Sequence, residues 1–147
     1  MPPAGPPQGQ VRHLSDNRVE AERSEHALQL AREGKRVVVV SSGDPGVFAM
    51  ATAVLEVQHT RGYEDVSVRV LPGMTAAQAV ASRVGAPLGH DFALISLSNR
   101  LKPWEQVVTR VRAVAGADMA MAIYNPASKK RTWQVEEFKN ILLEYRT

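Results

Sequence analysis

The sequence predicts an α/β fold in which helices flank a partly parallel sheet, and three features of the chain support that class. Short β-branched runs alternate with longer segments in which apolar residues recur at helical spacing. The run Arg36–Ser41 holds four consecutive valines, as is typical of a parallel strand covered on both faces. Three strand-like runs break into tight turns, and open α/β sheets bind small molecules at such strand ends. The sequence therefore predicts one shared ligand site at the ends of three strands.

The first half of the chain is expected to alternate helices with strands. Asn17 and Glu20 can form a capping box for a first helix, which Gly34 would end. Arg36–Ser41 would then form the first strand. The elements expected after it are a helix, a strand, a helix and a strand, at Val47–Val57, Val66–Leu71, Met74–Val84 and Phe92–Leu97.

The second half is expected to hold a helix, a strand and a last helix. Pro103 suits the first turn of a helix, and apolar residues then recur at helical spacing as far as Val114. Met119–Tyr124 has the pattern of a strand, and Thr132 can cap a final amphipathic helix. Asn99–Lys102 has the character of an inter-domain linker. We therefore expect a flexible tail, a first domain and a second α/β domain, at residues 1–12, 13–98 and 99–147.

Composition excludes several classes of protein. The chain has 147 residues, of which 44% are hydrophobic and 22% charged, so a globular domain is expected. It has no cysteine, which excludes disulfides and thiolate metal sites and fits a cytoplasmic location. No apolar run approaches the roughly 20 residues of a membrane helix, and the proline-rich Met1–Gln10 does not resemble a secretory signal. We expect no membrane partner.

The net charge of +3 leaves the charged surface open to interpretation. No stripe of alternating aromatic and basic residues is present, so we expect no nucleic-acid partner. The excess of positive charge suits an anionic small substrate, and an ordinary solvated surface explains it equally well.

Phrases at the three strand ends resemble the tetrapyrrole methyltransferases of cobalamin biosynthesis. They read Gly43-Asp44-Pro45, Pro72-Gly73-Met74-Thr75-Ala76 and Ile123-Tyr124-Asn125-Pro126. Four further phrases narrow the resemblance to the precorrin-3B C17-methyltransferases within that family: Ser15-Asp16-Asn17-Arg18, Gly85-Ala86-Pro87-Leu88-Gly89-His90-Asp91-Phe92-Ala93, Ile95-Ser96-Leu97-Ser98 and Pro103-Trp104-Glu105. The likeness covers roughly residues 10–147.

The resemblance implies an enzyme that uses S-adenosylmethionine. Such an enzyme methylates C17 of precorrin-3B, contracts the ring to give precorrin-4, and works as a homodimer with its site between two domains. The residues implied to contact the cofactor are Ser42, Gly43, Asp44, Val47, Thr75, Ala76, Tyr124 and Asn125. Simpler interpretations stand beside these roles: Asp-Pro-Gly is good turn chemistry, Thr75 can cap a helix, and Asn125-Pro126 can end a strand.

The implied chemistry needs few catalytic groups. Methyl transfer to an electron-rich carbon is an in-line displacement, so no dedicated nucleophile is required. Ring contraction moves a proton, and His90 with Asp91 are the natural candidates to carry it. The alternative is that His90 caps a turn and Asp91 lies on the surface. The other histidines have no metal-ligand spacing, so no metal is expected.

Basic residues after two of the strands are candidates for binding the many carboxylates of a precorrin. Arginine binds a carboxylate through two hydrogen bonds, and lysine as a point charge. The candidates are Arg100, Lys102, Lys129, Lys130 and Arg131. A solvated surface is the alternative.

Two parts of the family pattern have no counterpart in the sequence. Family members open with a strand and a glycine- and proline-rich cofactor loop, and they continue well beyond the last expected helix. The sequence is therefore expected to be a middle segment, or a truncated product, of such an enzyme, with independent activity left open. Residues 13–98 would form an incomplete cofactor-binding domain and residues 99–147 the start of the second domain. A non-catalytic ligand-binding or assembly module is the alternative. A nucleotide-binding domain is disfavoured, since the chain has neither Gly-x-Gly-x-x-Gly nor a P-loop.

Overall fold

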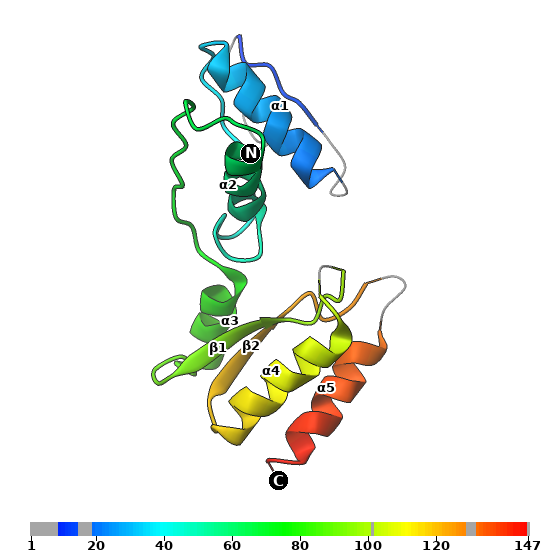
Figure 1. The fold of residues 1–147 in the computed structure, drawn as a ribbon. Helices are drawn as coiled ribbons and strands as arrows, with labels where there is room; N and C mark the ends of the chain where they lie inside the picture. The colour runs from blue at the N-terminus through cyan, green and yellow to red at the C-terminus, as the bar shows by residue number, and fades with distance from the viewer. Residues whose placement is uncertain (1–8, 15–18, 101, 129–131, 147) are drawn as a thin grey trace. The chain divides into compact units, whose positions relative to one another are not determined.

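The structure is a computed structural model that describes residues 9–14, 19–100, 102–128 and 132–146 (Figure 1). In chain order its elements are α1 (Glu20–Arg32), α2 (Met50–Thr60), α3 (Ala76–Val84), β1 (Phe92–Ser96), α4 (Trp104–Gly116), β2 (Ala120–Tyr124) and α5 (Trp133–Leu143). These elements form two compact units. Unit 1 consists of Met1–Val40 and Met50–Val70, and unit 2 consists of Ser41–Ala49 and Leu71–Thr147.

Unit 1 is a pair of packed helices, α1 and α2. Its buried core consists of Leu28, Val54, Val57, Tyr63 and Val66. The first turn of α1 is acidic and its last turn basic, which suits the helix dipole. Gly34 follows the helix with a positive φ of 83°, a conformation that glycine adopts without strain.

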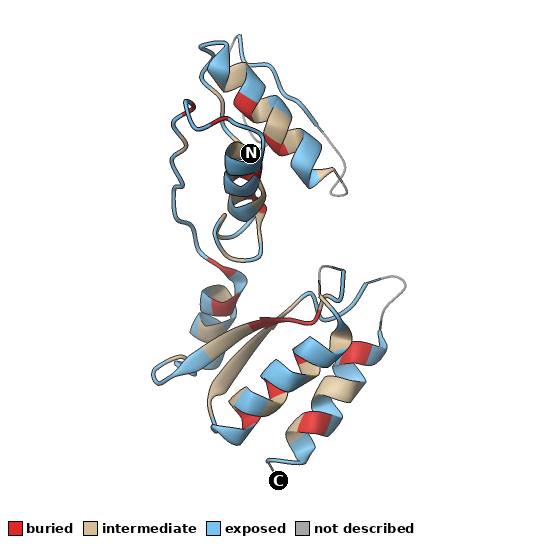
Figure 2. Cartoon of the chain, viewed as in Figure 1, coloured by how far each residue is buried: buried red, intermediate tan, exposed pale blue. Residues whose placement is uncertain are grey.

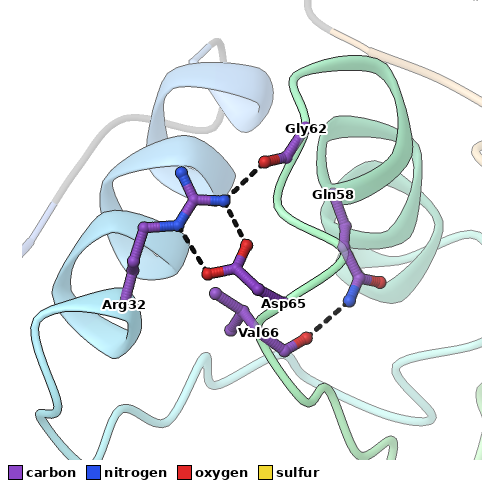
Figure 3. Close-up of polar contacts among 5 residues, drawn as sticks. All are labelled: Arg32, Gln58, Gly62, Asp65 and Val66. Atoms are coloured by element: carbon purple, nitrogen blue, oxygen red, sulfur yellow. Dashed lines mark hydrogen bonds and ion pairs between the residues drawn. The ribbon is translucent and has the colours of Figure 1, made fainter.

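A polar network ties the end of α1 to the segment after α2 (Figure 3). The guanidinium of Arg32 pairs with both carboxylate oxygens of Asp65, donates to the Gly62 carbonyl, and lies 4.1 Å from the centre of the Tyr63 ring. The Asp65 hydrogen bond raises the pKa of Arg32, and the same bond lowers the pKa of Asp65. The side-chain amide of Gln58 donates to the Val66 carbonyl at 2.7 Å.

Unit 2 is built around two parallel strands. β1 pairs with β2 in register from Phe92 opposite Ala120 to Ser96 opposite Tyr124. α4 packs against both strands and against α5, and the buried core includes Leu97, Val107 and Val111. Figure 2 shows the buried positions of α4 and α5 as red bands on largely exposed helices. The chain thus has the α/β class that the sequence predicts, with a parallel sheet and flanking helices.

The predicted strand Arg36–Ser41 is wrong. The segment has no regular structure, and Val38 and Val40 are 81% and 82% exposed. A β-branched run becomes a strand only where a neighbouring strand pairs with its backbone groups. Within the described residues the sheet consists of β1 and β2, so this run has no such partner there. The predicted strand Val66–Leu71 is wrong for the same reason.

The remaining elements agree with the sequence within a few residues. The second helix begins at Met50 instead of Val47, because Phe48 has a positive φ of 51° that no helix accommodates. The predicted capping box at α1 involves Asn17, which lies outside the described residues. Val19 occupies the N-cap position of α1. Thr132 occupies that of α5, but its side chain makes no capping hydrogen bond.

The predicted domain boundary between residues 98 and 99 falls inside unit 2. The strands on either side of it, β1 and β2, pair with each other, and α4 packs on both. The boundary concerns the domains of a complete enzyme and stays a prediction.

Candidate functional site

The candidate site lies in unit 2, where the loop after Ser41 meets the loop before α3. The Asp44 carboxylate joins the two loops: Oδ1 accepts the Gly46 amide at 2.8 Å, and Oδ2 accepts the Gly73 amide at 2.9 Å. The hydrogen bond from Gly73, followed by that from Gly46, lowers the pKa of Asp44. Asp44 is therefore held in its ionised form as a link between two backbone loops.

Glycines allow the two loops to touch. A Cβ on Gly73 would lie 2.3 Å from the carbonyl oxygen of Gly43, a backbone atom that cannot move aside cheaply. Gly43 has a positive φ of 74°, which glycine adopts without steric cost. The Gly-Asp-Pro and Pro-Gly-Met-Thr phrases thus approach more closely than a side chain at Gly73 would allow.

Tyr124, at the end of β2, makes the third connection. Its hydroxyl accepts the backbone amide of Ala77 at 2.8 Å and lies 2.5 Å from the Thr75 hydroxyl. Thr75 is the N-cap residue of α3, is 8% exposed, and makes no side-chain capping bond of its own. The ring of Phe48 packs against the Tyr124 ring at a centroid distance of 5.0 Å.

Asn125 continues this end of the sheet. Its side-chain amide donates to the Ser96 hydroxyl at 3.0 Å, and Ser96 is buried at the end of β1. Asn125 has a positive φ of 50°, a conformation that asparagine tolerates better than most residues. The carboxyl ends of both strands are thereby linked through side chains as well as through the ladder.

Two open cavities border these residues. One, of about 350 Å³, has polar groups from Asp44, Thr75 and Gln78 beside apolar walls; the other residues lining it are Val47, Pro72, Gly73, Ala77, Leu88, Phe92 and Leu94. The other, of about 410 Å³, is mostly apolar and lies between α3 and β2. Of the two, the first combines apolar walls with a few convergent polar groups, which is the usual makeup of a small-molecule site.

The structure brings most of the predicted cofactor residues together. Gly43 lies at the loop contact, Asp44, Val47 and Thr75 line the smaller cavity, and Ala76 and Tyr124 line the larger one. Asn125 follows Tyr124 directly. Ser42 is exposed beside Gly43 and is not among the lining residues of either cavity.

The predicted catalytic pair lies elsewhere. His90 and Asp91 are both exposed in the loop that leads into β1. They lie next to Phe92, the first residue of that strand, whereas Asn125 contacts its last residue, Ser96. Neither residue lines either of these two cavities. Their catalytic role stays a prediction.

The predicted substrate-binding residues are described only in part. Arg100 is exposed in the loop after β1, and Lys102 is half-buried next to the start of α4. Burial lowers the pKa of Lys102, and the neighbouring charge of Arg110 lowers it further. Lys129, Lys130 and Arg131 lie outside the described residues.

Sequence reasoning missed several residues of the site. Phe48 carries the ring contact to Tyr124, and Ser96 receives the Asn125 amide. Leu88, Phe92 and Leu94 form apolar walls of the smaller cavity. The sequence offered one signal for the walls, namely the placement of Phe92 and Leu94 at alternate positions of a predicted strand, where side chains share a face.

The chain belongs to the tetrapyrrole (corrin/porphyrin) methylases, because the model of that family matches residues 3–147. It is 62% identical over 138 residues to the cobalamin biosynthesis protein CobIJ of Mycobacterium tuberculosis, covering 94% of this chain and 27% of that protein. It is 50% identical over 135 residues to the precorrin-3B C(17)-methyltransferase of a Sinorhizobium species, covering 90% of this chain and 53% of that protein.

A solved structure has the same fold. The crystal structure of the methyltransferase CobJ matches 98% of this chain with a TM-score of 0.93 and 50% sequence identity. The chain covers 61% of that structure, and about a quarter to a half of the two relatives named above.

Two further features concern metal ions and membranes. Among the residues that the structure describes, no three histidine, aspartate or glutamate side chains are grouped so that they could hold a metal ion. Within the same residues, every helix is too short or too polar to span a bilayer.

Proposed function

We propose that this chain forms part of an S-adenosylmethionine-dependent methyltransferase of cobalamin biosynthesis that methylates C17 of precorrin-3B and contracts the ring to give precorrin-4. One observation carries the proposal: the three phrases predicted to contact the cofactor are joined in unit 2 by Asp44 and Tyr124, beside a cavity of about 350 Å³. The family membership and the 50–62% identity to relatives of that pathway support it.

The residues of the smaller cavity fit S-adenosylmethionine. Its volume falls within the range of about 300–1,000 Å³ that is usual for small-molecule sites. Val47, Leu88 and Phe92 offer apolar contacts for a nucleoside, while Thr75 and Gln78 offer polar groups. Asp44 contributes negative charge, which favours the positively charged sulfonium and ammonium groups of this cofactor.

The proposed reaction requires the protein mainly to bind and orient the cofactor and the tetrapyrrole. The cofactor supplies an activated methyl group, and the tetrapyrrole carbon is already electron-rich. Alignment of two reactants can lower a barrier by about 7–11 kcal/mol at best. We therefore assign the cavity residues to orientation. His90 and Asp91 are kept as candidates for the proton transfers of ring contraction.

Among the related substrates, precorrin-3B is the one we propose. Relatives named for cobalt-factor III are 37–47% identical to this chain, below the 50% of the relative named for precorrin-3B. Arg100, Lys102, Lys129, Lys130 and Arg131 would bind the substrate carboxylates. A homodimer in the cytoplasm completes the proposal.

Calorimetric titration of the 147-residue chain with S-adenosylhomocysteine tests the cofactor part. We expect saturable binding at one site per chain, with Tyr63→Phe in unit 1 as a control variant that keeps the affinity. Absence of binding by a folded chain would contradict the proposal for this chain. Titration of the saturated complex with precorrin-3B and with cobalt-factor III then compares the two substrates. Tighter binding of cobalt-factor III would overturn the substrate choice.

A further inference from the structure

We propose that Tyr124 is a positioning residue for the cofactor site, acting through Thr75 and the first turn of α3. This inference rests on the proposed function and deepens it. Tyr124 would orient the Thr75 hydroxyl so that it donates a hydrogen bond into the smaller cavity. The hydrogen bonds that the Tyr124 hydroxyl makes support this role.

The N-terminus of α3 is capped by a side chain from outside the helix. The first amides of a helix have no partner inside the helix, and a threonine at the N-cap position usually accepts one of them. Thr75 does not, although it occupies that position. The phenol oxygen of Tyr124, from another element, accepts the Ala77 amide instead. Thr75 is thereby released from the capping role that its position predicts.

The Tyr124 hydroxyl makes one hydrogen bond of fixed direction and one in which either oxygen can donate. A backbone amide can only donate, so the phenol oxygen must accept from Ala77. The Thr75 oxygen, at 2.5 Å, is the acceptor that the described residues offer the phenol proton, and in this contact either oxygen can donate. If Tyr124 donates to that oxygen, the Thr75 proton remains free to donate elsewhere. Thr75 lines the smaller cavity, so an acceptor oxygen of a bound ligand would receive it there.

Tyr124 is itself held firmly in place. Its own carbonyl accepts the Leu97 amide at 2.9 Å, its strand pairs with β1, and its ring packs against Phe48. Tyr124 lines the larger cavity and is not among the residues that line the smaller one, and its hydroxyl already contacts Ala77 and Thr75. Tyr124 therefore affects the smaller cavity through Thr75, without touching a ligand in it.

Three variants separate this role from a general effect on stability. Tyr124→Phe removes the hydroxyl and keeps the ring against Phe48, Thr75→Val removes the other hydroxyl at nearly constant shape, and Tyr63→Phe removes a tyrosine hydroxyl from unit 1 as the matched control. We expect Tyr124→Phe and Thr75→Val each to raise the dissociation constant for S-adenosylhomocysteine roughly two- to tenfold. The double variant should be no weaker than the worse single variant, since both changes break one chain of hydrogen bonds.

A measurement in the absence of ligand tests whether Tyr124 caps α3, independently of the proposed function. Exchange of the Ala77 amide with solvent should accelerate in Tyr124→Phe and stay unchanged in Tyr63→Phe. If the unmodified chain fails to bind S-adenosylhomocysteine, the proposed function fails, while the exchange rate still tests the cap. Unchanged Ala77 exchange, unchanged affinity in Tyr124→Phe, or additive losses in the double variant would each overturn the positioning role.

Discussion

The carboxylate of Asp44 accepts a hydrogen bond from the backbone amide of Gly73, 29 residues further along the chain, at 2.9 Å. This contact joins two loops whose sequences resemble one family's cofactor-binding phrases. The donor is a main-chain amide and the acceptor is the short side chain of Asp44, so the bond holds the two loops close together. The shape of the smaller cavity depends on that link, because both loops contribute to its walls.

Asp44→Asn should weaken cofactor binding while leaving the fold intact. The asparagine oxygen can accept one amide, but its NH₂ group would face the other amide donor, so one of the two hydrogen bonds to Asp44 is lost. We expect the dissociation constant for S-adenosylhomocysteine to rise roughly tenfold. Calorimetry on the wild-type chain and the variant measures it. Equal affinities would remove Asp44 from the site.

The same pair of proteins should differ in pH dependence. The pKa of Asp44 is lowered in the folded state by its two amide donors. Its contribution to stability is therefore complete above the unfolded-state pKa of about 4 and disappears as the pH falls through the lower folded-state value. Denaturant unfolding of wild type and Asp44→Asn between neutral and strongly acidic pH should show a stability difference that shrinks on acidification. A difference that grows instead would contradict the ionised link.

Gly73→Ala should damage the site more than an alanine at another glycine. The new Cβ would lie 2.3 Å from the Gly43 carbonyl oxygen, so one loop must move, at a cost of about 1–3 kcal/mol. Gly116→Ala is the control, because a Cβ there meets the Tyr145 ring at an ordinary 3.5 Å. The midpoint temperature of thermal unfolding and the affinity for S-adenosylhomocysteine should both fall in Gly73→Ala and stay unchanged in Gly116→Ala. Full binding by Gly73→Ala would show that the loops need no close approach.

Leu97→Ala should strongly destabilise unit 2. Leu97 is 0% exposed and belongs to the core that α4 and α5 cover, so truncation leaves a cavity costing about 2–5 kcal/mol. Leu143→Ala, on the exposed side of α5, should change the free energy of unfolding by less than about 0.5 kcal/mol. Chemical denaturation compares the two. Similar losses in both variants would refute the assignment of the core.

Lys102→Met should weaken binding of the tetrapyrrole and spare the cofactor. The pKa of Lys102 is lowered by burial and by Arg110, which means that its surroundings disfavour the cation and would gain from an arriving carboxylate. Lys139→Met, an exposed position on α5, is the matched control. Titration with precorrin-3B in the presence of S-adenosylhomocysteine gives the affinity. If the cofactor affinity falls as much as the substrate affinity, the assignment of Lys102 to substrate binding alone is wrong.

Local signals in the sequence predicted the elements that surround the site. The helical spacing of Val107 and Val111 and the apolar run of β1 depend on neighbours a few residues away, and both appear where expected. The prediction of a strand at Arg36–Ser41 was wrong because a strand needs a neighbouring strand to pair with, and a run of valines does not specify one.

The site shows the same division between local and distant information. The motifs pointed to Asp44, Thr75 and Tyr124, but not to the hydrogen bonds that connect them across 29 and 49 residues. The contribution of Phe48 depends on a positive φ, which a bulky residue rarely adopts and a sequence pattern does not reveal.

Chemical-shift mapping of the ¹⁵N-labelled chain with S-adenosylhomocysteine tests most directly whether the joined loops form a cofactor site. We predict saturable shifts at the amides of Gly43, Gly73 and Ala77, with unit 1 amides such as those of Leu28 and Val57 unchanged. The absence of any saturable shift, or shifts confined to unit 1, would contradict the account.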